Sequence, residues 1–146
     1  MSSLIRFTLI ALALLSTAAC SSKPVLNPHR SVPLEIHASQ EQMKQAILTT
    51  LIKRKWTVQR VGPTKIQAEI TVREQFHAEI DIDYSPVSYK INYRDSRGLN
   101  YSDGKIHKNY IRWVRLLDKG ILQELRNTQA QTSARNISNT PPTVTP

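Results

Sequence analysis

An alternation of apolar and polar residues through the middle of the chain, residues 65–93, constrains the fold more than any other feature. Successive side chains of a β-strand point to opposite faces of a sheet, so this pattern predicts strands with one buried and one wet face, as in antiparallel sheets. Gly62-Pro63 and Ser85-Pro86 supply turns between them. We predict strands at residues 56–61, 65–73, 76–84 and 88–94. The inward-facing residues of the last three are Ile66, Ala68, Ile70, Val72, Phe76, Ala78, Ile80, Ile82, Tyr84, Tyr89, Ile91 and Tyr93.

Amphipathic helices are predicted on either side of these strands. Ser39 with Gln42 three residues later is a capping-box signature for a helix over residues 40–55. A second helix, residues 107–127, has apolar residues at helical spacing. A short strand at residues 32–36, which Pro33 confines to a sheet edge, precedes both. The order β-α-β-β-β-β-α predicts a two-layer α+β domain with both helices on one face of an antiparallel sheet.

The first nineteen residues have the pattern of a signal peptide: Arg6, an apolar stretch at 7–15 and small residues at 16–19. The only cysteine, Cys20, follows them, so no intramolecular disulfide can form. The stretch Thr17-Ala18-Ala19-Cys20 resembles the bacterial lipobox, although that motif more often has Leu where Thr17 stands. The resemblance implies cleavage before Cys20 and lipid attachment to its sulfur. The alternative is an ordinary cleavage site with an incidental cysteine.

The residues around this site predict how the exported chain is organised. Ser21 and Ser22 follow the cysteine, where Asp tends to retain lipoproteins of Gram-negative bacteria at the inner membrane, so the lipobox resemblance implies an outer-membrane protein, which we expect to face the periplasm. Residues 20–31 are polar, with two prolines, and predict the lipidated cysteine and a flexible tether. Residues 32–127 form the predicted domain. Residues 128–146 are rich in Ser, Thr, Asn, Gln and Pro, and we predict that they are disordered.

A second resemblance covers about residues 40–127 and the signal. This part of the chain is similar to a group of small, functionally uncharacterised lipoproteins of Gram-negative bacteria, which commonly have Asn where Ile111 stands here. The likeness implies an envelope location and a small α+β domain, and it implies no activity. The matching stretches are Ile82-Asp83-Tyr84, Tyr93-Arg94-Asp95-Ser96, Gly98-Leu99-Asn100-Tyr101, Ile106-His107-Lys108-Asn109-Tyr110, Trp113-Val114 and Leu117.

Residues suited to metal binding are few. No histidine stands at metal-ligand spacing to another, and we expect all four to be solvated or structural, His107 at the start of the last helix. Glu79, Asp81 and Asp83 share one face of a strand and offer ligands for calcium, but the loop of a known calcium site is missing. We favour ion pairs with neighbouring strands, and we expect neither a metal nor another cofactor. The available cations are Lys65, Arg73, Lys90 and Arg94.

No catalytic motif stands out. Serines 85, 88, 96 and 102 lie in no nucleophile elbow, and no Ser-His-acid order is evident, so we expect a protein that is not an enzyme. Two alternatives stay open: a hydrolase of envelope polymers, and a carrier of a small ligand or lipid between the helices and the sheet. The carrier would use space around Trp56, Phe76, Tyr89 and Trp113.

The candidate contact surface is a line of basic residues on the last helix, which we call the basic stripe. At helical spacing its members fall within about 60° of one another, opposite the apolar face. Ile111 and Leu122 flank it, and we expect them to be partly exposed. The full sequence has a net charge of +9. Because the chain is predicted to be exported, the predicted partner is an envelope protein or anionic lipid headgroups and not nucleic acid, and the oligomeric state stays open. The alternative is an ordinary solvated helix face. The basic stripe consists of Lys108, Arg112, Arg115, Lys119 and Arg126.

Overall fold

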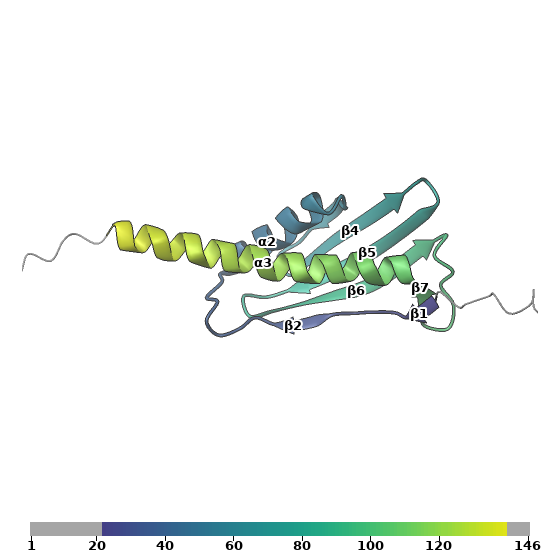
Figure 1. Ribbon diagram of the computed structural model, residues 1–146, viewed down its shortest axis with the longest axis horizontal. Helices are drawn as coiled ribbons and strands as arrows, with labels where there is room; N and C mark the ends of the chain where they lie inside the picture. The colour runs from purple at the N-terminus through teal and green to yellow at the C-terminus, as the bar shows by residue number, and fades with distance from the viewer. Residues whose placement is uncertain (1–21, 140–146) are drawn as a thin grey trace, which may run out of the picture.

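A computed structural model describes residues 22–139, and Figure 1 shows two helices lying across one face of an antiparallel sheet. The predicted two-layer α+β fold is confirmed. The main sheet has five strands in the order β2-β6-β5-β4-β3, and β1 and β7 form a separate two-stranded sheet. The elements are β1 (Ser22–Pro24), β2 (His29–Ser31), α2 (Gln40–Lys53), β3 (Thr57–Val61), β4 (Lys65–Val72), β5 (Phe76–Tyr84), β6 (Ser88–Arg97), β7 (Lys105–His107) and α3 (Lys108–Ser138).

The register of the central strands follows the alternation in the sequence. Ile66 pairs with Ile82 and Ala68 with Ile80, and all four side chains are buried under the helices. Because the side-chain period of a strand is two residues, the intervening polar side chains all point to the other face. The strands from β4 to β6 match the predictions closely, except that β6 continues three residues further, to Arg97.

The two helices pack closely against each other. The predicted capping box of α2 is confirmed, with reciprocal hydrogen bonds between Ser39 and Gln42. His107 caps α3 as predicted, because its Nδ1 accepts a hydrogen bond from the Asn109 amide. Where the helices cross, a Cβ atom on Gly120 would lie 2.6 Å from the Cγ2 of Thr50. Glycine therefore permits the close approach.

The predicted flexible tether at residues 20–31 is wrong for its described part. Ser22–Pro24 forms β1, which pairs with β7, and His29–Ser31 forms β2, which pairs with β6 and is itself an edge strand of the main sheet. The intervening residues are also bound, since the Ile91 amide donates to the carbonyl of Pro28. These contacts use the backbone, so polar side chains gave no sign of them.

The predicted strand at residues 32–36 is also absent from the structure. This stretch turns back on itself, and the amide of Ile36 donates to the carbonyl of Pro33. The edge of β6 is already occupied by β2, which lies just before this stretch in the chain. The edge position that we assigned to residues 32–36 therefore belongs to His29–Ser31.

The predicted disorder from residue 128 is wrong as far as Ser138, where α3 ends. No proline interrupts residues 128–138, and helix propagation from a packed first half adds one hydrogen bond per residue. Figure 1 shows this part of α3 projecting beyond the sheet. Its side chains are mostly exposed, which explains why the composition gave no helical signal. Residues 140–146 lie outside the described residues.

The loop before β7 closes one end of the domain. Gly98 has a left-handed φ of 70°, and a Cβ atom there would come within 2.0 Å of the Gln75 carbonyl oxygen. Only glycine fits both requirements. Neither α2 nor α3 is long and apolar enough to cross a membrane.

A candidate basic interface on helix α3

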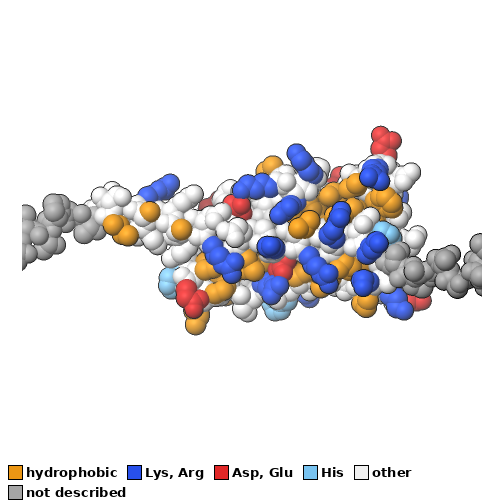
Figure 2. Space-filling model, in the orientation of Figure 1, with side chains coloured by type: hydrophobic (Ala, Val, Ile, Leu, Met, Phe, Trp, Pro, Cys, Tyr) orange, Lys and Arg blue, Asp and Glu red, His pale blue; other side chains and the backbone are white. Residues whose placement is uncertain are grey.

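All five residues of the basic stripe lie on the solvent side of α3 and are exposed. The opposite side of the helix is buried by Tyr110, Val114 and Leu117, as predicted. Figure 2 shows Lys and Arg side chains scattered along this face of the molecule, with few acidic ones between them. The structure thus places the predicted residues together on one surface.

The basic stripe is a line and not a cluster. From Lys108 to Arg126 it extends about 27 Å along the helix axis, at 1.5 Å per residue. Its members border different hollows on the surface. Arg112 borders one beside Trp113, Lys119 borders the groove between α2 and α3, and Arg126 borders one at the turn that contains Pro33. Such spacing suits a partner with an extended surface better than it suits a small ligand.

The two acidic residues of α3 within the described residues do not neutralise the basic stripe. Asp118 binds Arg30 of β2, and Glu124 binds Lys53 of α2 at 2.6 Å. Both acids are thus paired with cations that come from other elements. Within residues 22–139, no member of the basic stripe forms a salt bridge. The positive charge along α3 is therefore uncompensated.

Among residues 22–139, Asp118 is the most deeply buried charged residue. It is 7% exposed and accepts hydrogen bonds from Arg30 and from the hydroxyl of Tyr89, the latter at 2.9 Å. Burial, and then the bond to Asp118, raise the pKa of Tyr89 well above its usual value, while the carboxylate raises the pKa of Arg30. This group fixes the edge strand β2 to α3. Sequence reasoning missed it because Arg30 was assigned to the tether.

One of the two apolar neighbours of the basic stripe differs from the prediction. Ile111 is buried, at 4% exposure, whereas Leu122 is half-buried against the core and so partly exposed, as predicted. The prediction treated the segment before residue 32 as a flexible tether with no contact to the last helix. In the structure, β1 of this segment contacts α3. An exposed apolar residue beside the basic stripe is instead Leu116, which follows Arg115 in the chain, borders the stripe on the side of α2 and is 36% exposed.

Leu116 borders a groove between α2 and α3. Its volume is about 370 Å³. Lys119 and Arg54 form no salt bridge within the described residues, whereas Lys53 is bound to Glu124. The groove therefore places an exposed apolar side chain beside these two cations. The lining residues are Thr50, Lys53, Arg54, Leu116, Lys119, Gly120, Gln123 and Glu124.

The polar face of the sheet confirms the predicted ion pairing. Arg94 contacts Glu79 at 2.8 Å and Asp81 at 3.1 Å. Lys65 lies 3.6 Å from Asp81 and 3.4 Å from Asp83. The other two predicted cations, Arg73 and Lys90, form no salt bridge within residues 22–139. This face, unlike α3, brings its acids and bases together.

One group on this face could hold a metal ion. The Nε2 of His77 lies 3.2 Å from Glu79, and Glu69 offers a third ligand atom within 4.8 Å of the others. Imidazole nitrogen and carboxylate oxygen are both common ligands of zinc in proteins. In the structure, Gln59 binds Glu69 and Arg94 binds Glu79. Sequence spacing missed the group because Glu69 reaches it through strand pairing.

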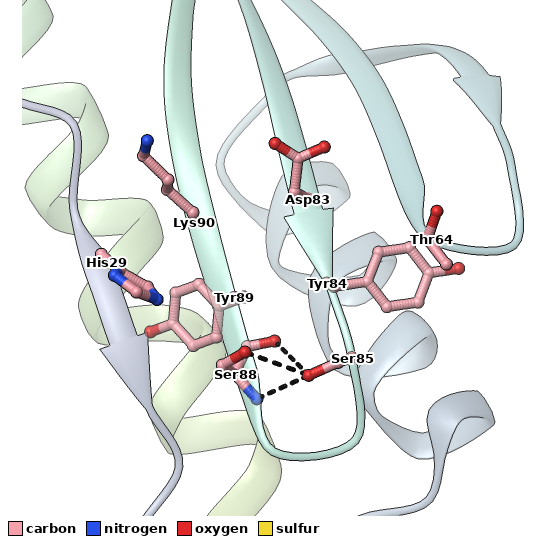
Figure 3. A pocket seen from close by; sticks show the side chains of 8 residues that line it. All are labelled: His29, Thr64, Asp83, Tyr84, Ser85, Ser88, Tyr89 and Lys90. Carbon is pink, nitrogen blue, oxygen red and sulfur yellow. Dashed lines mark hydrogen bonds between the residues drawn. The ribbon is translucent and has the colours of Figure 1, made fainter.

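A shallow pocket at the β5–β6 turn gathers residue types that are found in hydrolases, and Figure 3 shows them. The hydroxyl of Ser85 faces Ser88 across the turn at 3.0 Å and accepts from the backbone amides of Val87 and Ser88. His29 comes from the neighbouring strand β2 and Asp83 from the end of β5. The bonds of Ser85 hold its own turn, so we interpret it as a turn residue. The other lining residues are Thr64, Tyr84, Tyr89 and Lys90.

The aromatic residues considered for a carrier belong to the interior. Trp56, Tyr89 and Trp113 are buried members of the hydrophobic core, and Phe76 packs against its margin. Phe76 also stacks on His107, with ring centroids 6.1 Å apart. These contacts explain the four residues as packing between sheet and helices.

The predicted lipid site, Cys20, and the signal peptide lie outside the described residues. No family model and no curated protein sequence matches the chain.

Proposed function

We propose that this chain is a lipoprotein of the bacterial outer membrane, anchored through Cys20, and that its α3 helix binds an anionic partner surface. The observation that carries the proposal is the charge arrangement of α3. The acids of the helix are paired with Arg30 and Lys53, and its basic stripe forms no salt bridge with any residue of the range 22–139. The task is binding and not catalysis.

The chemistry of the envelope limits the partner. An acidic protein surface and phosphate-bearing headgroups both complement a line of Lys and Arg. Each basic residue near an anionic membrane contributes on the order of 1 kcal/mol, and salt screens it. Leu116 adds exposed apolar area beside the basic stripe, which favours a protein contact. An envelope protein with an acidic face is therefore the favoured partner.

Charge reversal on α3 tests the binding function. The triple variant Arg112→Glu, Arg115→Glu and Lys119→Glu should abolish capture of the partner in crosslinking pulldowns from intact cells. The matched control reverses Lys55, Arg60 and Lys90, which are exposed, lie outside α3 and form no salt bridge within the described residues. Equal capture by both folded variants would remove the basic stripe from the proposal.

Mass spectrometry of the mature protein tests the anchor separately. The N-terminal fragment should begin at Cys20 and carry acyl chains. Because Cys20 is the only cysteine, the variant Cys20→Ser should leave the domain unchanged and release it from membranes. An unmodified Cys20, or cleavage elsewhere, would refute lipid anchoring without affecting the charge experiment.

A further inference from the structure

We infer that the end of the domain formed by β1 and β7 rests directly on anionic lipid headgroups, with α3 directed away from the membrane. We call this surface the anchor end, and define it by Lys23, Tyr101, Lys105 and Lys108. The inference rests on the proposed lipid attachment at Cys20, and it assigns Lys108 to the membrane and the remainder of the basic stripe to the partner.

The length of chain between the lipid and the fold sets the distance. β1 begins at Ser22, two residues after Cys20, and Ser22 pairs with His107. Two extended residues span at most about 7 Å. A headgroup layer is about 5–8 Å thick, from the difference between the hydrocarbon core and the whole bilayer. A lipid on Cys20 therefore holds β1 at headgroup level, with no tether to separate the domain from the surface.

The composition of the anchor end fits headgroups. Lys23 pairs with Ile106 between Lys105 and His107, and α3 begins at Lys108 with no acidic residue in its first turn. All three lysines are exposed. The adjacent loop contains one acidic residue, Asp103, so the three lysines and this aspartate together carry a net positive charge. Ammonium groups at this depth meet the phosphates of the lipids.

An exposed aromatic ring adds an independent reason. Tyr101 lies in the loop before β7 and is 48% exposed. Its ring stacks on Tyr93 at 4.5 Å between centroids, which holds it in place at the end of the core. Tyrosine is enriched where proteins meet the membrane–water interface because its ring is amphipathic. Lysine and an exposed tyrosine together are what such an interface requires.

The direction of α3 divides the basic stripe. Figure 1 shows β1 and β7 at one end of the long axis, where α3 begins, and the last turns of α3 projecting at the other end. Measured along the helix from Lys108, Arg115 lies about 10 Å away and Arg126 about 27 Å away. The distal basic residues are therefore held clear of the bilayer and open to a protein partner.

Quenching by spin-labelled headgroups tests this orientation. Mature lipidated protein is placed in vesicles of phosphatidylethanolamine and phosphatidylglycerol, with a fluorescent amino acid at Ser102 or at Gln131. Both positions are exposed, and Gln131 is about 35 Å along α3 from Lys108. We expect most of the fluorescence at Ser102 to be quenched. The fluorescence at Gln131 should be unchanged. Quenching at both positions means that the domain lies flat, and quenching at neither means that it stands off the bilayer. Either result overturns the inference.

A charge variant and an artificial anchor complete the test. The triple variant Lys23→Glu, Lys105→Glu and Lys108→Glu should reduce quenching at Ser102 to the level seen with phosphatidylcholine vesicles, whereas reversal of Arg115, Lys119 and Arg126 should not. Unchanged quenching in the first variant removes the lysines from the contact. If the natural protein fails to float with vesicles, the lipid-anchoring part of the proposed function fails. Coupling Cys20 to a maleimide lipid then supplies the anchor, and the same quenching pattern is still measured.

Discussion

Arg30 donates hydrogen bonds to both carboxylate oxygens of Asp118, from Nε at 2.9 Å and from the terminal nitrogen at 2.6 Å, across 88 positions of sequence. The pair joins the edge strand β2 to the middle of α3. Such a two-pronged geometry is the strongest form of an Arg–carboxylate contact. Asp118 is nearly buried, so the segment before residue 32 belongs energetically to the domain.

Removing this carboxylate should destabilise the protein. Asp118→Ala leaves Arg30 without its partner, and leaves the Tyr89 hydroxyl with only its 3.1 Å hydrogen bond to the backbone carbonyl of residue 118. Loss of one member of a buried pair costs about 3–5 kcal/mol, and because the Arg30 side chain is 51% exposed we expect about 2 kcal/mol. Urea unfolding measures the change. Glu124→Ala, whose partner Lys53 is 61% exposed, should cost under about 1 kcal/mol, and equal losses would contradict the assignment.

The helix crossing predicts a coupled pair of substitutions. Gly120→Ala puts a methyl group against the Cγ2 of Thr50, and overpacking of this kind costs about 1–3 kcal/mol. Adding Thr50→Ser removes that methyl group and keeps the hydroxyl, which bonds the Ala46 carbonyl. The double variant should then recover stability, helped by about 1 kcal/mol from the higher helix propensity of alanine. Thermal unfolding of the four proteins gives the coupling, and simple additivity would exclude the steric explanation.

Stability should fall at alkaline pH because of Tyr89. Its pKa is raised in the folded protein by burial and by Asp118. The unfolded chain therefore releases this proton first, and the associated stability is present below pH ~10 and lost as the pH rises above it. Tyr89→Phe removes this contribution. The difference in free energy of unfolding between the natural protein and the variant should therefore become smaller as the pH rises from neutral to pH ~11. A constant difference across that range would show that Tyr89 is not responsible. Tyr101→Phe is the exposed control.

The projecting part of α3 should contribute little to the free energy of unfolding. Ending the chain after Asn127 removes mostly exposed helix, so we expect a loss below about 1 kcal/mol with a clear decrease in helical circular dichroism. Denaturant titration and far-ultraviolet spectra measure the two effects. A loss of several kcal/mol would show that residues 128–138 support the core.

The sequence predicted the elements whose side chains alternate or recur. The period-two pattern from Ile66 to Tyr93 predicted three strands, because burial of one sheet face places apolar residues at every second position of the sequence. The Ser39 capping box predicted the start of α2. The errors fall where backbone bonds or helix propagation decide the structure. β1, β2 and the end of α3 have polar side chains, and only their hydrogen bonds place them.

The candidate site was predicted only in part. Helical spacing placed the basic stripe on the solvent face, but it did not reveal that Arg30 and Lys53 neutralise the acids of α3. Those partners come from distant elements, and pairing across elements has no local signal. The same reason explains why Ile111 was expected to be partly exposed although the fold buries it.

The pairing of β1 with β7 has a consequence for the order of folding. Ser22 at the start of the described chain finds its strand partner only at His107, so this contact closes one of the longest loops in the domain. Contacts of such separation form late, because chain entropy must be overcome before they stabilise anything. If the chain is exported as we propose, the segment that follows Cys20 would be among the last to be enclosed. We then expect it to stay accessible to processing enzymes until β7 has formed.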